Sequence, residues 1–409
     1  MVVIAGSVWE TWREREAKYR KPSIALLLTT DAPPEAARTA LAEATREVMQ
    51  PRVAKSDAAG PGEEEFRPGY CSLARVPQGV LLRIDEGPDD FQDLLQGIAK
   101  GLRGRDIAGQ FDLYEPEGVP EIPELVDLFE CHLRPEGERA PLPNGKPFWK
   151  PDENALAQAV RGGIAWCQDN GSGIPLSLTV SLLPPVTLDP EEDIERYVVE
   201  GIESARPVGV VYLTSATPDR FRTLAVRTSN GGVGMIEGGT AAQDDWQASV
   251  RRLTAVLRAS APWTVYGFVK RGSRRVNAIL GTSLPSDWLD VPHTNVLRSD
   301  RWAFEDRFVP DAFGVQLLSP GHGNAPGGPD WRVERLPSGR VLVEHVNPTA
   351  WFDGSLVRFG GHGNPFFNPF PPPPEFLRRA REDFDPILYR DGSEPAYADV
   401  LGDDRFIKP

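Results

Sequence analysis

The chain has 409 residues, a formal net charge of −14 and a hydrophobic content of 40%. This length is sufficient for two or three hydrophobic cores, and the composition excludes a wholly disordered chain. The negative charge argues against nucleic acids and anionic membranes as partners, because both carry the same sign of charge, and it favours a cationic protein.

The first part of the chain predicts a strand–helix–strand–strand–helix–strand order. A helix at 8–20 with Trp9 and Trp12 on one face precedes it. Strands are expected at 23–29, 70–76, 80–84, 111–114 and 125–133, because these runs are short and largely apolar. Apolar residues at helical spacing predict helices at 37–48 and 91–102.

A similar order follows from residue 151 to residue 272. Helices are predicted at 152–167, 189–202 and 246–257, and strands at 174–183, 208–214, 223–228 and 265–269, with a glycine-rich hairpin or bulge at 231–239. Residues 135–150 are rich in proline and glycine, which is typical of a linker.

The C-terminal third has a different pattern. Two alternating runs at 331–336 and 341–346 flank Pro337-Ser338-Gly339, which predicts a β-hairpin. We therefore expect an α+β protein with two ferredoxin-like sheet-and-helix modules and a β-rich C-terminal portion. The predicted boundaries are 1–135, a linker at 136–150, 151–285 and 286–409.

Four residues are the candidate metal ligands. His322 and His362 each begin a His-Gly-Asn tripeptide, and with His345 and Asp353 they form a residue set of the zinc type. None of these residues is spaced as ligands on one helix or hairpin usually are. Glycine, asparagine and histidine are also favoured by loop conformations alone, and this interpretation is the preferred one.

Aromatic residues near the C-terminus are the candidate partner contacts. Phe366, Phe367 and Phe370 lie in a segment of repeated Asn-Pro-Phe followed by four prolines, and Trp351 precedes it. The alternative is a rigid connector on the protein surface.

No other motif indicates a cofactor or a reaction, and we expect none. The glycine-rich run at 228–234 lacks the Gly-Lys-Ser/Thr ending of a phosphate-binding loop. Cys131 and His132 are adjacent on a predicted strand, so they point to opposite faces and form no catalytic pair. The basic stretch Lys270, Arg271, Arg274 and Arg275 is interpreted as a solvated loop, not as a nucleic-acid site.

The location of the protein is inferred from its cysteines and its apolar runs. Cys71, Cys131 and Cys167 lie in apolar segments without a CxxC motif, which predicts reduced, buried thiols. The first six residues are too few for a signal peptide, and no run approaches the roughly 18 apolar residues of a membrane span. We expect a cytoplasmic protein that does not bind membranes.

Four stretches of the C-terminal third resemble a known family. These are VPDAFGVQLLSP at 309–320, the hairpin LPSGRVLV at 336–343, PTAWFDGS at 348–355 and the helix at 376–388. Their order is similar to that in bacterial immunity proteins of polymorphic-toxin and type VI secretion systems. The chain departs from that pattern at Gln316, where the family often carries a tryptophan.

The resemblance implies a noncatalytic α+β protein that binds and blocks a cognate toxin. Together with the acidity, it favours a protein-binding module whose partner is a basic toxin. The alternatives are an enzyme with a site between the modules, using His345, His362 and Asp353, and a structural subunit of a larger assembly.

Overall fold

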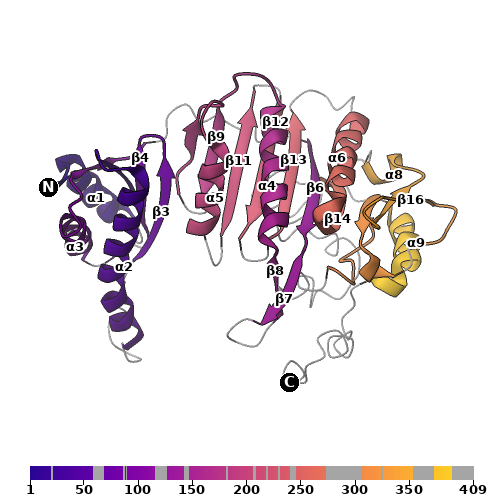
Figure 1. Ribbon diagram of the computed structural model, residues 1–409, viewed down its shortest axis with the longest axis horizontal. Helices are drawn as coiled ribbons and strands as arrows, with labels where there is room; N and C mark the ends of the chain where they lie inside the picture. Colours follow the sequence, from indigo (N-terminus) through magenta and orange to yellow (C-terminus); the bar gives the residue numbers. More distant parts are fainter. Residues whose placement is uncertain are drawn as a thin grey trace. The chain divides into compact units, whose positions relative to one another are not determined.

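The computed structural model describes residues 1–19, 22–58, 69–85, 88, 90–115, 127–141, 147–180, 183–205, 209–217, 220–228, 231–239, 246–272, 305–323, 326–352 and 373–388. The chain divides into two compact units, Met1–Val119 with Ser177–Val211, and Pro120–Leu176 with Tyr212–Pro409. Helices and sheets occur in both units, which confirms the predicted α+β class (Figure 1). Among the helices described, none combines the length and the hydropathy that crossing a bilayer requires.

The first unit contains a five-stranded sheet with the order β1-β5-β2-β4-β3. The strands of this sheet are β1 (Val2–Ile4), β2 (Ile24–Thr29), β3 (Tyr70–Val76), β4 (Gly79–Asp85) and β5 (Gly109–Leu113). The helices that alternate with these strands along the chain are α1 (Gly6–Lys18), α2 (Pro34–Ala58) and α3 (Phe91–Arg103). All neighbouring strands are antiparallel except β1, which pairs parallel with β5. The order β5-β2-β4-β3, with α2 after β2 and α3 after β4, is the ferredoxin-like arrangement that the sequence predicted.

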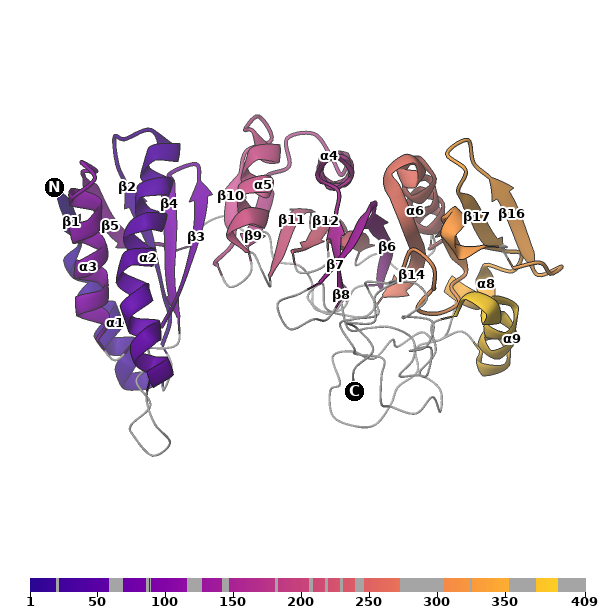
Figure 2. The same ribbon diagram turned by 60° about the horizontal axis from the view of Figure 1, so that its bottom comes forward.

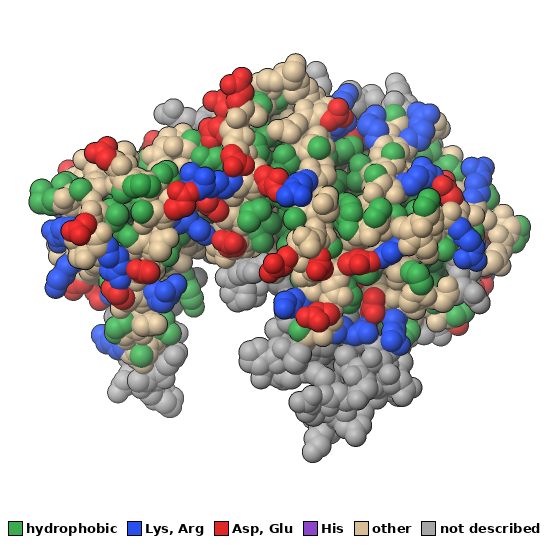
Figure 3. Space-filling view, viewed as in Figure 1, with side chains coloured by type: hydrophobic (Ala, Val, Ile, Leu, Met, Phe, Trp, Pro, Cys, Tyr) green, Lys and Arg blue, Asp and Glu red, His purple; other side chains and the backbone are tan. Residues whose placement is uncertain are grey.

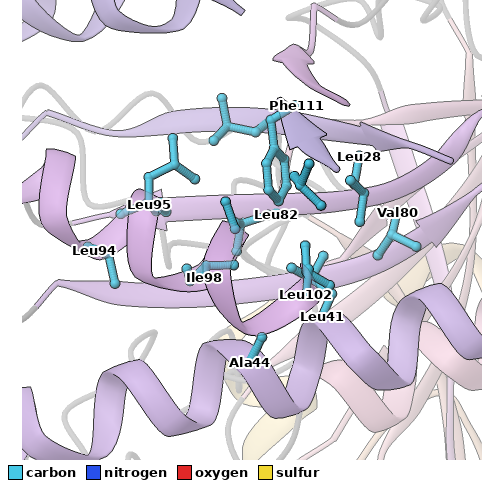
Figure 4. Close-up of a cluster of buried hydrophobic side chains, with 14 of the residues drawn as sticks. Leu28, Leu41, Ala44, Val80, Leu82, Leu94, Leu95, Ile98, Leu102 and Phe111 are labelled. Atoms are coloured by element: carbon cyan, nitrogen blue, oxygen red, sulfur yellow. The ribbon is translucent and has the colours of Figure 1, made fainter. Parts of the chain in front are cut away.

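The core of this module lies between the sheet and the helices α2 and α3 (Figures 2 and 4). Alternate residues of β2 and β4 point to this core because side chains alternate between the faces of a strand. Trp12 of α1 stacks on Phe91 of α3 with ring centroids 3.8 Å apart. The following fully buried side chains line the core: Leu26, Leu28, Leu41, Val80, Leu82, Leu94, Ile98, Leu102 and Phe111.

The remaining strands form a ten-stranded sheet and a separate hairpin. The sheet has the order β10-β9-β11-β12-β13-β6-β14-β15-β17-β16, and β7 pairs with β8 alone. The strands are β6 (Asp127–Pro135), β7 (Gly137–Pro141), β8 (Pro147–Pro151), β9 (Leu176–Val180), β10 (Val186–Leu188), β11 (Val210–Ala216), β12 (Arg220–Arg227), β13 (Val233–Gly239), β14 (Thr264–Gly272), β15 (Val315–Leu318), β16 (Trp331–Arg335) and β17 (Val341–His345). The helices are α4 (Glu153–Gln168), α5 (Ile194–Ser204), α6 (Trp246–Ser260), α8 (Thr349–Phe352) and α9 (Pro374–Phe384), with short 3-10 turns η1 (Ala261–Trp263), η4 (Pro320–His322) and η5 (Asp385–Ile387).

A second ferredoxin-like order is present within this sheet. The chain contains, in this order but not consecutively, β6, α4, β12, β13, α6 and β14, and the strands lie in the order β12-β13-β6-β14. The sequence assigned β6 to the end of the first module, but it pairs with β13 and β14 and is the first strand of the second. Between α4 and β12 the chain inserts β9, β10, α5 and β11, which lengthens this second pass.

Helices α4 and α6 cover the same face of the second module. A Cβ added to Gly163 of α4 would lie 2.4 Å from Leu224 of β12, and one added to Gly267 of β14 would lie 2.5 Å from Leu257 of α6. These two glycines therefore allow a close approach of helix and strand. The two strand positions lie on one face, because the register places Leu224 opposite Met235 and Gly267 opposite Leu133.

The segment predicted as a linker contains ordered structure. β7 and β8 form a hairpin, although residues 142–146 between them lie outside the described residues. Trp149 of β8 is buried and its indole donates to the Pro135 carbonyl at 3.0 Å. The C-terminal hairpin of β16 and β17 is present as predicted, and through β15 it continues the sheet of the second module.

Candidate functional site

A row of charged side chains lies on the face of the large sheet that points away from α4 and α6. On β6, Cys131 and Leu133 point toward the helices, so Glu130, His132 and Arg134 point to the other face. All three are buried, with Arg134 completely so. Buried charges are stable only when they are paired, so their partners define this cluster.

Glu305 is the partner of Arg134. Its carboxylate pairs with the Arg134 guanidinium and lies 3.8 Å from Nε2 of His132. Burial raises the pKa of Glu305, but the charges of Arg134 and His132 outweigh burial, so the pKa is lowered from its usual value. The carboxylate of Glu305 is therefore ionised, and its pairing with Arg134 holds Glu305 against β6.

Glu130 and Lys270 form the second buried pair. They lie directly opposite each other on β6 and β14, with Nζ and Oε2 3.3 Å apart. Burial raises the pKa of Glu130, and the Lys270 ammonium offsets only part of this effect. The two carboxylates of the cluster thus have pKa shifts of opposite sign.

Aromatic and neutral polar groups surround these pairs. Phe268 of β14 stacks on Phe313 with ring centroids 3.9 Å apart, and on His132 with centroids 4.9 Å apart. The Tyr266 hydroxyl lies 2.9 Å from the side-chain amide of Gln316. The segment that carries Glu305 and Phe313 thus packs on the helix-free face through charged and aromatic contacts together.

His322 lies at the end of this segment and is buried. The Ser319 backbone N–H donates to its Nδ1 at 3.1 Å, which places the proton of the neutral ring on Nε2. Burial lowers the pKa of His322 to about 4. The ring is therefore neutral at physiological pH.

Helix α9 is fixed to the middle of the same segment. Arg381 of α9 makes a bidentate pair with Asp311, at 2.8 and 2.6 Å. Aromatic rings continue the contact, with Trp331 4.8 Å from His345 and His345 4.5 Å from Phe376. Together these contacts form the C-terminal aromatic cluster, which comprises Trp331, His345, Trp351, Phe376 and Phe384.

The buried ion pairs hold the segment that carries Glu305, and strand β14, to strand β6. General acid–base or nucleophilic catalysis requires a titratable group in contact with a substrate. Here the charged groups point into the protein and bind one another, joining residues that are far apart in the chain. Burial raises the pKa of Cys71 and Cys167 to about 12 and raises that of Cys131 as well, which keeps these thiols protonated at physiological pH.

The structure separates two of the predicted metal ligands. His345 ends β17 beside Gly314, whereas His322 follows the other end of β15. The four strand residues between these ends span about 13 Å, which is too far for one ion to bind both rings. Asp353 and His362 lie outside the described residues, and within the described ranges no three His, Cys, Asp or Glu side chains form a potential metal site.

The predicted partner contacts are described only in part. Trp351 is 7% exposed and lies against Gly314, so its ring contributes to the core of the C-terminal aromatic cluster. Phe366, Phe367 and Phe370 lie outside the described residues. The interpretation of the basic stretch as a solvated loop was wrong for Lys270 and Arg271, which belong to strand β14 and are buried. Arg271 donates to the Phe352 carbonyl at 2.9 Å. Arg274 and Arg275 lie outside the described residues.

Sequence reasoning missed Glu130, Arg134, Lys270 and Glu305 as a group. A signal was present for the first two, because Glu130, His132 and Arg134 recur at every second residue and therefore share one face of a strand. No local pattern indicated that Glu305, 171 residues after Arg134, would be their partner.

Comparison with known proteins identifies no family. No family model matches the chain, and no curated protein matches it. Among solved structures, it is similar to "Pseudomonas aeruginosa T6SS protein PA0821", with 9% identity and a TM-score of 0.33 over 70% of this chain and 90% of that one. This TM-score is below the level at which two chains are said to share a fold.

Proposed function

We propose that this protein is a noncatalytic binding module of the immunity type, which neutralises a basic toxin by forming a complex with it. The observation that carries the proposal is that the described parts of the four stretches resembling immunity proteins pack against one another. Their packing makes the four stretches parts of one structural unit, as a fold shared with such proteins would require.

The contacts among the four stretches are direct. Gln316 in the first stretch is opposite Val343 in the second. A Cβ on Gly314 would lie 2.6 Å from Trp351 of the third stretch. Arg381 of the fourth pairs with Asp311 of the first. These motif residues build one packed unit, which supports a structural role for the residues that carry the resemblance.

The negative net charge of the chain supports a partner that is basic. With a formal net charge of −14, the chain attracts a basic protein over the range set by salt screening. Figure 3 shows acidic and basic side chains interspersed over the face that it draws, and a group of acidic side chains lies over α5. A complex formed this way would associate rapidly, and its rate would depend on salt.

The test is a titration of toxicity. A candidate toxin encoded beside this protein would be expressed alone and together with it, and growth would be measured. Purified protein would then be added to purified toxin at increasing molar ratio. A binder abolishes toxin activity near one equivalent, and the complex elutes as one species in size-exclusion chromatography.

An enzyme that destroyed the toxin or its product would act far below one equivalent. That result, or failure of the two proteins to co-elute, would contradict the proposal. The matched control is a toxin from an unrelated system, which should remain active at every ratio.

A further inference from the structure

The strand β16 forms one edge of the ten-stranded sheet (Figure 2). Its first residue, Trp331, is buried, but Arg332, Val333, Glu334 and Arg335 are all exposed, with Val333 44% exposed. In the described part of the chain, no strand pairs with its outer side. An open edge of this kind offers backbone groups to another strand.

The hydrogen-bond pattern shows which residues face outward. The Val346 N–H donates to the Asp330 carbonyl, and the Leu336 N–H donates to the Arg340 carbonyl. Because bonding positions alternate along an antiparallel strand, Arg332 and Glu334 bond inward to β17. Val333 and Arg335 therefore direct their N–H and carbonyl groups away from the sheet, as does the Trp331 carbonyl.

We propose that a second copy of this chain docks here, with two β16 strands pairing antiparallel and with Val333 opposite Val333. In this register the two Val333 residues exchange two hydrogen bonds. Each Arg335 N–H also reaches the Trp331 carbonyl of the second copy. The pairing joins two sheets edge to edge around a twofold axis, and the interface is self-complementary.

Side-chain charge selects this register. With Val333 opposite itself, Arg332 lies opposite Glu334 of the second copy on one face of the sheet, and Glu334 lies opposite Arg332. If one strand slides along the other so that the outward-facing residues still bond to each other, the nearest register in one direction places Arg332 opposite Arg332. The nearest register in the other direction places Glu334 opposite Glu334. Charged residues on an edge strand often prevent pairing. Here Arg332 and Glu334 face residues of opposite charge when Val333 lies opposite Val333, whereas the two neighbouring registers bring like charges together.

The internal contacts of β16 are compatible with this arrangement. Glu334 pairs with Arg258 of α6 at 2.8 Å, and its side chain is 52% exposed, so a carboxylate oxygen can still accept from a second guanidinium. On the other face, the two exposed Val333 side chains would cover each other. The interface is short, so we expect a dissociation constant in the micromolar range.

Sedimentation equilibrium of the full chain, from low to high micromolar concentration, tests the proposal. The expected result is a monomer–dimer equilibrium. Val333→Pro should leave the protein monomeric, because proline removes the outward N–H and leaves the ladder to β17 in place. Thermal unfolding of this variant checks that it remains folded.

A charge swap provides the sharper test. Arg332→Glu alone and Glu334→Arg alone should each weaken the dimer about tenfold, because both cross-strand pairs become pairs of like charge. The double variant Arg332→Glu/Glu334→Arg should restore it, because opposite charges face each other again. A wild-type protein that is monomeric throughout, a dimer insensitive to the single changes, or a double variant no tighter than the singles would each overturn the proposal.

Discussion

Arg134 of β6 and Glu305 form an ion pair in the interior of the second unit, although 171 residues separate them in the chain. The guanidinium is fully buried and the carboxylate nearly so. The pair fixes the segment of residues 305–322 to the helix-free face of the sheet. It thereby links the C-terminal portion of the protein to the first strand of the second module.

Breaking this pair should destabilise the protein strongly. Arg134→Met leaves the Glu305 carboxylate buried without its main counter-charge, and we expect a loss of about 3–5 kcal/mol in the free energy of unfolding. Denaturant unfolding followed by circular dichroism measures this loss. The control is Arg378→Ala, which removes an exposed pair with Glu382 and should cost less than about 1 kcal/mol. Equal midpoints for the two variants would contradict the role assigned to Arg134.

His322 should make the protein less stable as pH falls. Burial lowers its pKa to about 4, whereas the unfolded chain has an ordinary imidazole. Between about pH 6.5 and pH 4 the unfolded state binds a proton that the folded state does not. The free energy of unfolding therefore decreases as the pH is lowered through that window. The shift corresponds to a loss on the order of 3 kcal/mol.

The variant His322→Asn isolates this contribution. Its amide oxygen can still accept from the Ser319 N–H, but it does not titrate. The free energy of unfolding, measured at several pH values, should therefore fall less steeply below pH 6.5 in the variant than in the wild-type protein. Parallel curves for the two proteins would refute the assignment.

Two adjacent glycines of α4 should respond differently to alanine. A Cβ at Gly163 would lie 2.4 Å from Leu224 Cδ1 and 2.9 Å from its Cγ, so Gly163→Ala forces helix and strand apart and should cost about 1–3 kcal/mol. At Gly162 the nearest atom, Met235 Cε, is 3.4 Å away, which is an ordinary contact. Gly162→Ala should therefore be neutral or stabilising by up to about 1 kcal/mol, because alanine favours the helix. Thermal unfolding of both variants checks this order, and a reversed order would show that α4 does not pack on β12 as described.

Binding of a basic toxin should weaken as salt increases. The net charge of −14 accelerates association with a cation, and dissolved ions screen that attraction. Surface plasmon resonance at low and high ionic strength should show a lower association rate at high salt and a smaller change in the dissociation rate. An association rate independent of salt would argue against a charge-guided complex.

The sequence predicted most elements of both modules because their signals are local, but residues 231–239, expected to form a hairpin or bulge, contain the single strand β13. In α3, apolar residues such as Leu94, Leu95, Ile98 and Leu102 recur at helical spacing, and all four are buried as that spacing requires. The hairpin of β16 and β17 was equally readable from its alternation and its Pro-Ser-Gly turn. Each of these features depends on residues a few positions apart.

The assignment of β6 could not be read in this way. Its residues mark a strand, but which neighbours it pairs with depends on β13 and β14, about 100 residues or more further along the chain. The same limit applies to Arg134 and Glu305, which a local pattern cannot bring together. It applies to His322 and His345 as well, since only the pairing of β15 with β17 places them at opposite ends.

The amino-acid order thus determined the class of the protein, most of its helices and strands, and its charge, because periodicity and composition act within one turn or one strand. Only tertiary structure decided which strands share a sheet and which buried charges become partners. Strand pairing and burial are set by the competition among all segments for a common core, and no single segment contains that information.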